Sequence, residues 1–364
     1  MRLPPTCVDK RDSQNMTHFF EHGYALLIGV NENDTQKLSL PAAEKDVDAL
    51  YKVLSNPKRC GYRAGNIKLL KGDDATRAGI LKGLKWLKER LNEDAADNAT
   101  VWFFFSGHGA KEGKGKTTSY HLIPKDFDQE IGLASAIRAQ EVAVAVAKMK
   151  PGRLIAVLDC CHAEGMNIKG DVEFFAEALP PSAFEAIFDS ESKEGHQKNL
   201  EALQQGTGRA VLSSSSASES SFVRSDRKMS VFTYHLIEAL TGYASVNDKA
   251  TEVLVSDVMS YMTRIVPETV KRDYGCAQTP QYQISGNFPL ALLAGGNGIQ
   301  KGENLPHPLE VSGDEPSREK DVFIDQKGDG AIAVGDHSIA VGKGGVMIGG
   351  NATNVRINTG NQIS

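Results

Sequence analysis

Short apolar runs alternate along most of the chain with segments whose apolar residues recur at helical spacing. Runs of this length, bounded by polar or small residues, are typical of buried strands. Strands that alternate with helices predict an α/β fold with a mostly parallel β-sheet sandwiched by helices. The predicted strands are Tyr24–Val30, Ile67–Leu70, Thr100–Phe105, Arg153–Leu158 and Ala210–Ser213.

The clearest predicted helix lies between the second and third of these strands. Its apolar residues recur every three or four positions, which places one apolar stripe on a helix: Ile80, Leu84, Leu87 and Leu91. Other helices are predicted around Val142–Val146, over Val231–Leu240 and over Ser256–Ile265. We expect Ser256 to be the N-cap of the last one, because a serine hydroxyl accepts a hydrogen bond from an unpaired helical N–H.

The chain changes character after residue 296. Residues 297–320 are rich in Gly, Pro, Glu and Lys and are typical of a linker. A repeat of seven residues follows, in Gly330–Asp336, His337–Lys343 and Gly344–Gly350. Glycine at the turns and apolar residues that alternate with small ones predict a small Gly-rich β-repeat of stacked arcs rather than a coiled coil. A flexible Gly-rich tail is the equally weighted alternative.

Composition excludes several classes of function. With 41 basic and 46 acidic residues, the chain has no charge bias toward nucleic acid or a membrane surface. No apolar stretch reaches the ~18 residues of a membrane span, and residues 1–22 lack the apolar core of a signal peptide. The five cysteines are scattered, which fits neither a disulfide framework nor a zinc site. We therefore expect a cytoplasmic protein without a bound metal.

Two of the predicted strands end in a reactive side chain. His108 follows the run Trp102–Gly107, and Cys161 follows Leu154–Cys160. Parallel α/β sheets carry their chemistry just beyond the carboxyl ends of such strands, so these two residues are expected to meet. A free thiol has a pKa of about 8.5 and needs a neighbouring base to become a thiolate at neutral pH. The pair predicts a cysteine nucleophile activated by histidine.

The neighbours of this pair have different predicted roles. Gly109 allows close approach of a substrate backbone and can offer an N–H to a developing oxyanion. Cys160 alternates to the other side of its strand and is expected to be a buried core residue. His121 and His162 are expected to be surface or structural histidines.

These motifs resemble, in order, those of the caspase-like cysteine peptidases, and among them the metacaspases and their prokaryotic relatives. The histidine precedes the cysteine by 53 residues, close to the ~50 of the caspase pattern. The resemblance covers about residues 20–296. Its segments are Gly23–Val30, Asp46–Leu50, Asn66–Leu70, Ala75–Arg77, Ser106–Gly109, Tyr120–Pro124, Asp159–His162, Arg209–Ser214 and Thr279–Tyr282.

The resemblance also implies a division of the chain. A peptidase domain at 20–296 follows an N-terminal extension at 1–19 and precedes the linker at 297–320 and a repeat segment at 321–364. Within the domain, 20–165 corresponds to the large subunit, 166–207 to the connecting loop and 208–296 to the small subunit.

In metacaspases the pocket for the P1 side chain, S1, is acidic, and the matching positions here are Asp46, Ser106 and Asp159. Buried carboxylates need a cationic partner or a network of donors, and a substrate Arg or Lys would supply the cation. For Asp46 alone, an acid in the first turn of a helix is an equally good interpretation. Asp48, on the same predicted helix, is ranked lower because its position does not match.

The family also raises the questions of calcium and self-cleavage. Asp126 and Asp128 are candidate calcium ligands, but Gly165–Gly170 after the nucleophile has no acid, and a hard cation needs several oxygen ligands. We therefore expect no cofactor. If P1 is basic, self-cleavage can occur at Lys169, Lys193, Lys198 or Arg209, and an uncut surface loop is the alternative.

Two functions follow from the resemblance. The first is a latent cysteine endopeptidase, a zymogen that cleaves protein substrates after Arg or Lys in a cell-death or antiviral defence response. The second is a catalytically silent scaffold on the same fold. In both, residues 321–364 are expected to bind an upstream sensor or another copy of the chain. The presence of both His108 and Cys161 favours the enzyme.

Overall fold

The computed structural model describes residues 19–33, 36–93, 96–113, 118–161, 179–188, 207–216, 219–245 and 249–293, together with four short strands beyond residue 320. The chain divides into two units, residues 1–309 and 310–364. The boundary between these units falls inside the linker predicted at 297–320.

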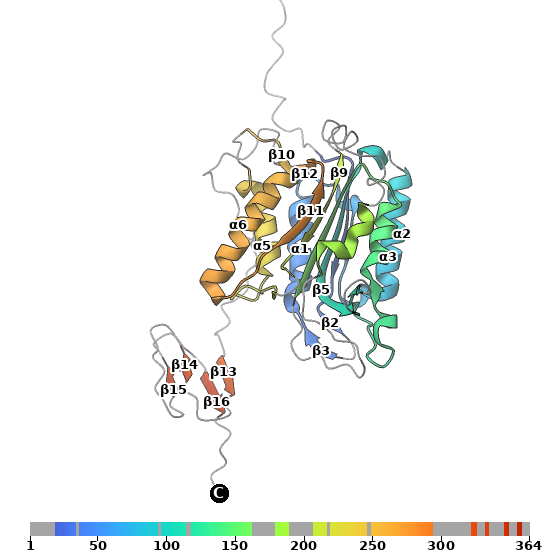
Figure 1. Ribbon diagram of the computed structural model, residues 1–364. Helices are drawn as coiled ribbons and strands as arrows, with labels where there is room; N and C mark the ends of the chain where they lie inside the picture. Colours follow the sequence, from blue (N-terminus) through green and yellow to red (C-terminus); the bar gives the residue numbers. More distant parts are fainter. Residues whose placement is uncertain are drawn as a thin grey trace, which may run out of the picture. The chain divides into compact units, whose positions relative to one another are not determined.

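The first unit is built on one large sheet, whose main path has the order β11-β9-β8-β5-β1-β4 (Figure 1). All neighbours on this path are parallel except β11, which pairs antiparallel with β9 at one edge. The mostly parallel sheet is therefore confirmed. The strands of this path are β1 (Gly23–Gly29), β4 (Ile67–Leu70), β5 (Thr100–Glu112), β8 (Arg153–Cys161), β9 (Gly208–Ser213) and β11 (Gln281–Ser285).

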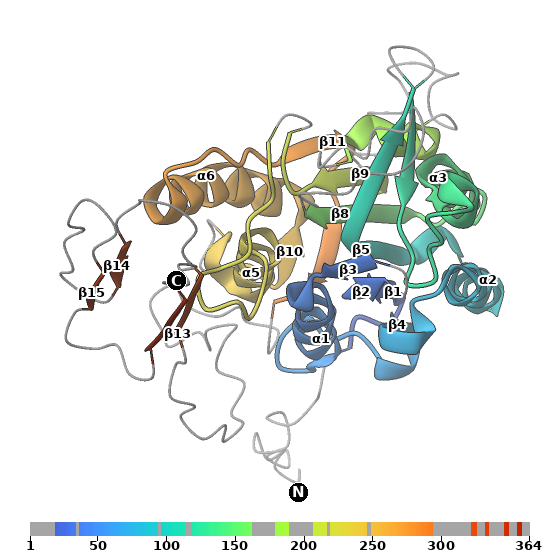
Figure 2. The ribbon, with the colours of Figure 1, turned by 90° about the horizontal axis from the view of Figure 1, so that it is seen from below.

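Helices cover both faces of this sheet (Figures 1 and 2). The helices α1 (Pro41–Ser55), α5 (Val231–Glu238) and α6 (Val255–Tyr274) lie on one face, and α2 (Arg77–Glu93) and α3 (Ala139–Ala147) lie on the other. Alternation along each strand divides the core into two clusters, so neighbouring residues of β8 belong to opposite faces. No helix among the described residues is both long and apolar enough to cross a membrane.

The histidine-bearing strand is longer than its apolar run predicts. After the run Thr100–Phe105, β5 continues to Glu112, and its last residues pair antiparallel with β6 (Ser119–Leu122). The remaining short strands are β2 (Glu32–Asn33), β3 (Gln36–Ser39), β7 (Ile137–Arg138), β10 (Glu252–Leu254) and β12 (Pro289–Leu292). The short helical turns are η2 (Ala64–Asn66), η3 (Gly72–Asp74), η4 (Ala96–Asn98), η6 (Gly132–Ser135), η7 (Pro181–Ile187) and η8 (Ala239–Tyr243).

The predicted helices are present, but several of their boundaries are wrong. The helix predicted over Ser256–Ile265 runs from Val255 to Tyr274, and the one predicted over Val231–Leu240 ends at Glu238. The α2 stripe of Ile80, Leu84, Leu87 and Leu91 is buried as expected. Ser256 is not the N-cap of α6, because β10 runs directly into the helix and Leu254 is the capping position. The Ser256 N–H instead donates to Asn287 Oδ1 at 3.2 Å.

The second unit contains two pairs of parallel strands. β13 (Val322–Asp325) pairs with β16 (Val355–Asn358), and β14 (Ile332–Val334) pairs with β15 (Val346–Ile348). In the second pair Ile332 is opposite Val346, two sequence repeats further along. The stacked-arc arrangement of the whole repeat stays a prediction.

The stripe on α2 makes a first testable prediction. Leu87 is fully buried against the sheet, whereas Leu81 on the same helix is 40% exposed. Leu87→Ala is expected to lower the free energy of unfolding by about 2–5 kcal/mol, because it leaves a cavity in the core. Leu81→Ala is expected to change it by less than about 1 kcal/mol. Urea unfolding followed by circular dichroism measures both, and equal effects would contradict the helix assignment.

Candidate active site

The two reactive positions lie opposite each other on neighbouring strands. β5 and β8 are parallel, and their register pairs Ser106 with Asp159 and His108 with Cys161. His108 and Cys161 form the last pair of this register, so the backbone positions of the predicted base and nucleophile are adjacent. His108 is buried, and its carbonyl accepts a hydrogen bond from the Ile123 N–H at 3.0 Å.

The neighbouring thiol is a core residue. Cys160 is buried with the cluster that faces α2 and α3, on the side predicted from strand alternation. Burial, followed by the negative charge of Asp159, raises the pKa of the Cys160 thiol well above its ordinary value. A thiol held in its protonated form is a poor nucleophile, so Cys160 is unsuited to catalysis.

Two other neighbours of the predicted pair have structural contacts. Gly109 begins the segment of β5 that pairs with β6, and a Cβ there would come within 2.0 Å of Leu179 Cδ1. A side chain at this position would have to displace the end of the Leu179 side chain. His121 is also structural as expected, since it is buried with its Nε2 3.1 Å from Ser119 Oγ. His162 lies outside the described residues.

The three residues expected in S1 form one buried network. Asp46 of α1, Ser106 of β5 and Asp159 of β8 are all fully buried. The Ser106 hydroxyl donates to Asp46 Oδ2 at 3.0 Å, and the negative charge of Asp159 acts on Asp46. Residues from three distant segments of the sequence are thus brought together at the carboxyl edge of the sheet.

Three residues that the sequence did not indicate complete this network: Ser221, Ser230 and Thr233, named here the hydroxyl clamp. The Ser221 hydroxyl donates to Asp159 Oδ1 at 3.2 Å, and the hydroxyls of Ser230 and Thr233 both donate to Asp159 Oδ2. The Ser230 N–H also donates to Asp46 Oδ1 at 2.9 Å, so this residue bridges the two carboxylates.

The hydrogen-bond partners of the two buried carboxylates decide how their charge is compensated. Among the residues that the structure describes, every hydrogen-bond partner of Asp46 and Asp159 is a neutral hydroxyl or N–H. Burial and the charge of Asp159 raise the pKa of Asp46, against the hydrogen bonds from Ser230 and Ser106. Burial likewise raises the pKa of Asp159, against the hydrogen bonds of the hydroxyl clamp.

The structure corrects the simpler interpretation of Asp46. Helix α1 begins at Pro41, so Asp46 is in its second turn, where a carboxylate gains little from the helix dipole. Its oxygens are held by other elements of the fold instead. Asp48 points elsewhere, since it is partly exposed and pairs with Lys71 at 2.7 Å.

The structure also removes one candidate self-cleavage site. Arg209 lies in β9, between β8 and β11, and its Nη1 donates to the carbonyls of Gly152 and Gly208. A peptide bond inside the central sheet cannot enter a peptidase groove without unfolding. Lys169, Lys193 and Lys198 lie outside the described residues.

Most of the chain matches one known protein family. The sequence matches the caspase domain over residues 22–289, most of the chain. The chain belongs to the caspase family of cysteine peptidases. The match spans β1 to β12 and so contains both predicted catalytic positions and the carboxylate pair.

Solved structures give distant similarities to this caspase domain. A protein from Geobacter sulfurreducens is 16% identical, with a TM-score of 0.46, and the match covers 76% of this chain and 99% of that one. Caspase-1 from Spodoptera frugiperda is 15% identical, with a TM-score of 0.43 and coverages of 83% and 99%. The Drosophila initiator caspase Dronc is 12% identical, with a TM-score of 0.45 and coverages of 79% and 88%. The search of curated proteins found no match.

The candidate calcium ligands of this caspase domain, Asp126 and Asp128, accept hydrogen bonds from backbone N–H groups. Asp126 Oδ1 accepts the Arg77 N–H at the start of α2, and Asp128 Oδ1 accepts the Glu130 N–H within its own turn. Within the described residues, no group of three or more acidic, histidine or cysteine side chains is placed to hold a metal.

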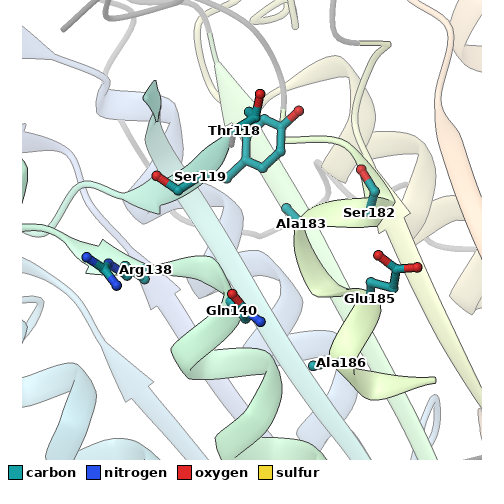
Figure 3. A pocket seen from close by; sticks show the side chains of 9 residues that line it. Thr118, Ser119, Arg138, Gln140, Ser182, Ala183, Glu185 and Ala186 are labelled. Atoms are coloured by element: carbon teal, nitrogen blue, oxygen red, sulfur yellow. The ribbon is translucent and has the colours of Figure 1, made fainter. Parts of the chain in front are cut away.

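A polar cavity of about 590 Å³ lies away from the carboxylate pair, beside β6, α3 and η7 (Figure 3). Arg138 and Gln140 line one side of it in this view, and Ser182 and Glu185 line the other. Because neither His108 nor the two aspartates line this cavity, we assign it no part in the chemistry of the caspase domain.

The raised pKa of Asp46 makes stability depend on pH. An acid whose pKa is higher in the folded state binds more protons folded than unfolded, so stability falls as pH rises above its ordinary pKa of about 3.9. Asp46→Asn cannot ionise and is expected to lose less stability than wild type between about pH 5 and about pH 8. Thermal unfolding across this range measures the difference.

Asp48→Asn is the matched control for this experiment, because it removes a partly exposed carboxylate from the same helix. Its stability curve is expected to run parallel to that of wild type. If the Asp46→Asn curve also ran parallel, the pair would not hold a proton in the folded caspase domain.

Proposed function

We propose that this protein is a cysteine endopeptidase that cleaves protein substrates after Arg or Lys, with Cys161 as nucleophile and His108 as its base. The observation that carries the proposal is a buried carboxylate pair beside these positions: Asp159 lies on β8, two residues before Cys161, and Asp46 lies on α1. The partners of both carboxylates among the described residues are neutral. Membership of the caspase family supports the reaction class, and the carboxylate pair supports the substrate preference.

The proposed reaction uses the ends of the two central strands. The imidazole of His108 takes the proton of the Cys161 thiol, and the thiolate attacks the scissile carbonyl. The Gly109 N–H is the proposed donor to the oxyanion that develops on that carbonyl. His108 then protonates the leaving amine, and water hydrolyses the thioester on Cys161 to release the acid and regenerate the thiol.

The charge of the site supports a basic P1 residue. Two carboxylates buried next to each other are costly unless a cation compensates them or a proton is retained. An Arg or Lys side chain would supply the cation, and a guanidinium can bind a carboxylate through two parallel hydrogen bonds. An acidic P1 side chain would add a third negative group to the same site and would be rejected.

Regulation is the second part of the proposal. Both carboxylates are fully buried, which supports a latent state that an activating event must open. The repeat segment 321–364 is the proposed contact to an upstream sensor in a cytoplasmic cell-death or antiviral defence response, and its parallel strand pairs support a stacking role. Lys169, Lys193 and Lys198 remain the proposed self-cleavage sites.

Peptide cleavage tests the catalytic assignment. Fluorogenic peptides with Arg, Lys, Asp or Leu at P1 are incubated with wild type and with Cys161→Ala and Cys160→Ala. Cleavage after Arg and Lys is expected to be lost in Cys161→Ala and kept in Cys160→Ala, because the Cys160 thiol is a core residue. Asp159→Ala is expected to reduce cleavage after Arg at least about a hundredfold, since a buried cation would lose its partner.

Asp48→Ala, which removes a partly exposed carboxylate of α1, is the control for Asp159→Ala and is expected to cleave like wild type. Cleavage after Asp would contradict the basic pocket and leave the catalytic pair intact. Activity that survives in Cys161→Ala would contradict the nucleophile. Silence with every peptide, also after addition of an activating partner, would favour the scaffold.

A further inference from the structure

The hydroxyl clamp donates to the carboxylate oxygens of Asp159, which are also the oxygens that a basic P1 side chain would bind. Asp159 Oδ2 receives the hydroxyls of both Ser230 and Thr233, and Asp159 Oδ1 receives that of Ser221. Asp46 is held by the Ser230 N–H and by the Ser106 hydroxyl. Each carboxylate oxygen of Asp46 and Asp159 therefore accepts at least one hydrogen bond from the protein itself.

The clamp belongs to one continuous segment next to the site. Ser230 is the N-cap of α5, and its Oγ accepts the Thr233 N–H at 2.9 Å. Val223 and Ser230 form an isolated antiparallel bridge, and the Arg224 N–H donates to the Met229 carbonyl at 2.9 Å. These contacts close a narrow loop whose tip, residues 225–228, is exposed. At its base Val223 and Arg224 are partly buried, and Met229 and Ser230 are buried.

We propose that the segment 221–233 is a movable wall of the S1 pocket, and that Ser230 and Thr233 set its selectivity by releasing Asp159 to the incoming P1 cation. This inference rests on the proposed cleavage after basic residues. A P1 guanidinium binds Asp159 through both oxygens and has to displace more of the clamp than an ammonium, which binds as a point charge. The clamp therefore reduces affinity for Arg more than for Lys.

The alternative role for these hydroxyls predicts the opposite result. Donors that stay in place during binding would orient the carboxylates, and removal of one would weaken the binding of any basic side chain. Donors that have to be displaced cost binding energy, and removal of one would strengthen it. The sign of the change in affinity therefore separates a wall that moves from a fixed support.

Thr233→Val is the test substitution, because valine keeps the shape of threonine and leaves the N-cap hydroxyl of Ser230 in place. The dissociation constants of three peptides that differ only at P1, with Arg, Lys or norleucine, are measured by titration calorimetry. The full-length Cys161→Ala chain is used so that no peptide is cleaved. We expect Thr233→Val to bind the Arg peptide about three- to tenfold more tightly, the Lys peptide less so, and the norleucine peptide unchanged.

Thr241→Val is the matched control, since its buried hydroxyl bonds only to the carbonyls of Ile237 and Glu238. It is expected to bind all three peptides like its parent. Unchanged or weaker binding of the Arg peptide by Thr233→Val would overturn the movable wall and leave the proposed function standing. If the parent itself bound Arg and Lys no better than norleucine, the basic preference would fail, and the inference would fail with it.

Discussion

The electrostatic interaction between two buried carboxylates, Asp46 and Asp159, which Ser230 bridges, is the constraint on which the rest of the site depends. Like charges without a cation cannot both stay ionised in an apolar interior, so the fold must supply donors or retain a proton. It supplies donors from β5, from the loop before α5 and from the first turn of α5. The position of these elements is thereby linked to the protonation state of the pair.

The sheet places this pair next to the reactive positions. Parallel pairing of β5 with β8 sets Ser106 beside Asp159 and, two residues on, His108 beside Cys161. Because side chains alternate along β8, Asp159 points to the face covered by α1 and α5, and Cys160 is buried on the face covered by α2 and α3. The register of β5 and β8 thus places Cys160 in the core and places the proposed nucleophile, Cys161, two residues from Asp159 of the carboxylate pair.

Much of this arrangement could be predicted from the sequence, because the apolar runs before His108 and Cys161 mark the strands β5 and β8. The continuation of β5 beyond His108 to Glu112 was not predicted, because those residues are not an apolar run. The second-turn position of Asp46 was also within reach, since Pro41 is typical of a first helical position. The roles of Ser230 and Thr233 could not be predicted from the sequence. These residues lie 71 and 74 positions from Asp159, and hydroxyl side chains at a helix start show no periodic pattern that would identify their partner. The edge strand β11 was missed for a similar reason, since most of its side chains are exposed and it has no apolar run.

The most direct measurement is a crystal structure of the full chain with a peptide aldehyde that ends in arginine. The account predicts a covalent bond between Cys161 Sγ and the aldehyde carbon, with the guanidinium about 3 Å from a carboxylate oxygen of Asp159 or Asp46. An arginine side chain left in solvent, with both aspartates still held only by Ser106 and the hydroxyl clamp, would contradict it.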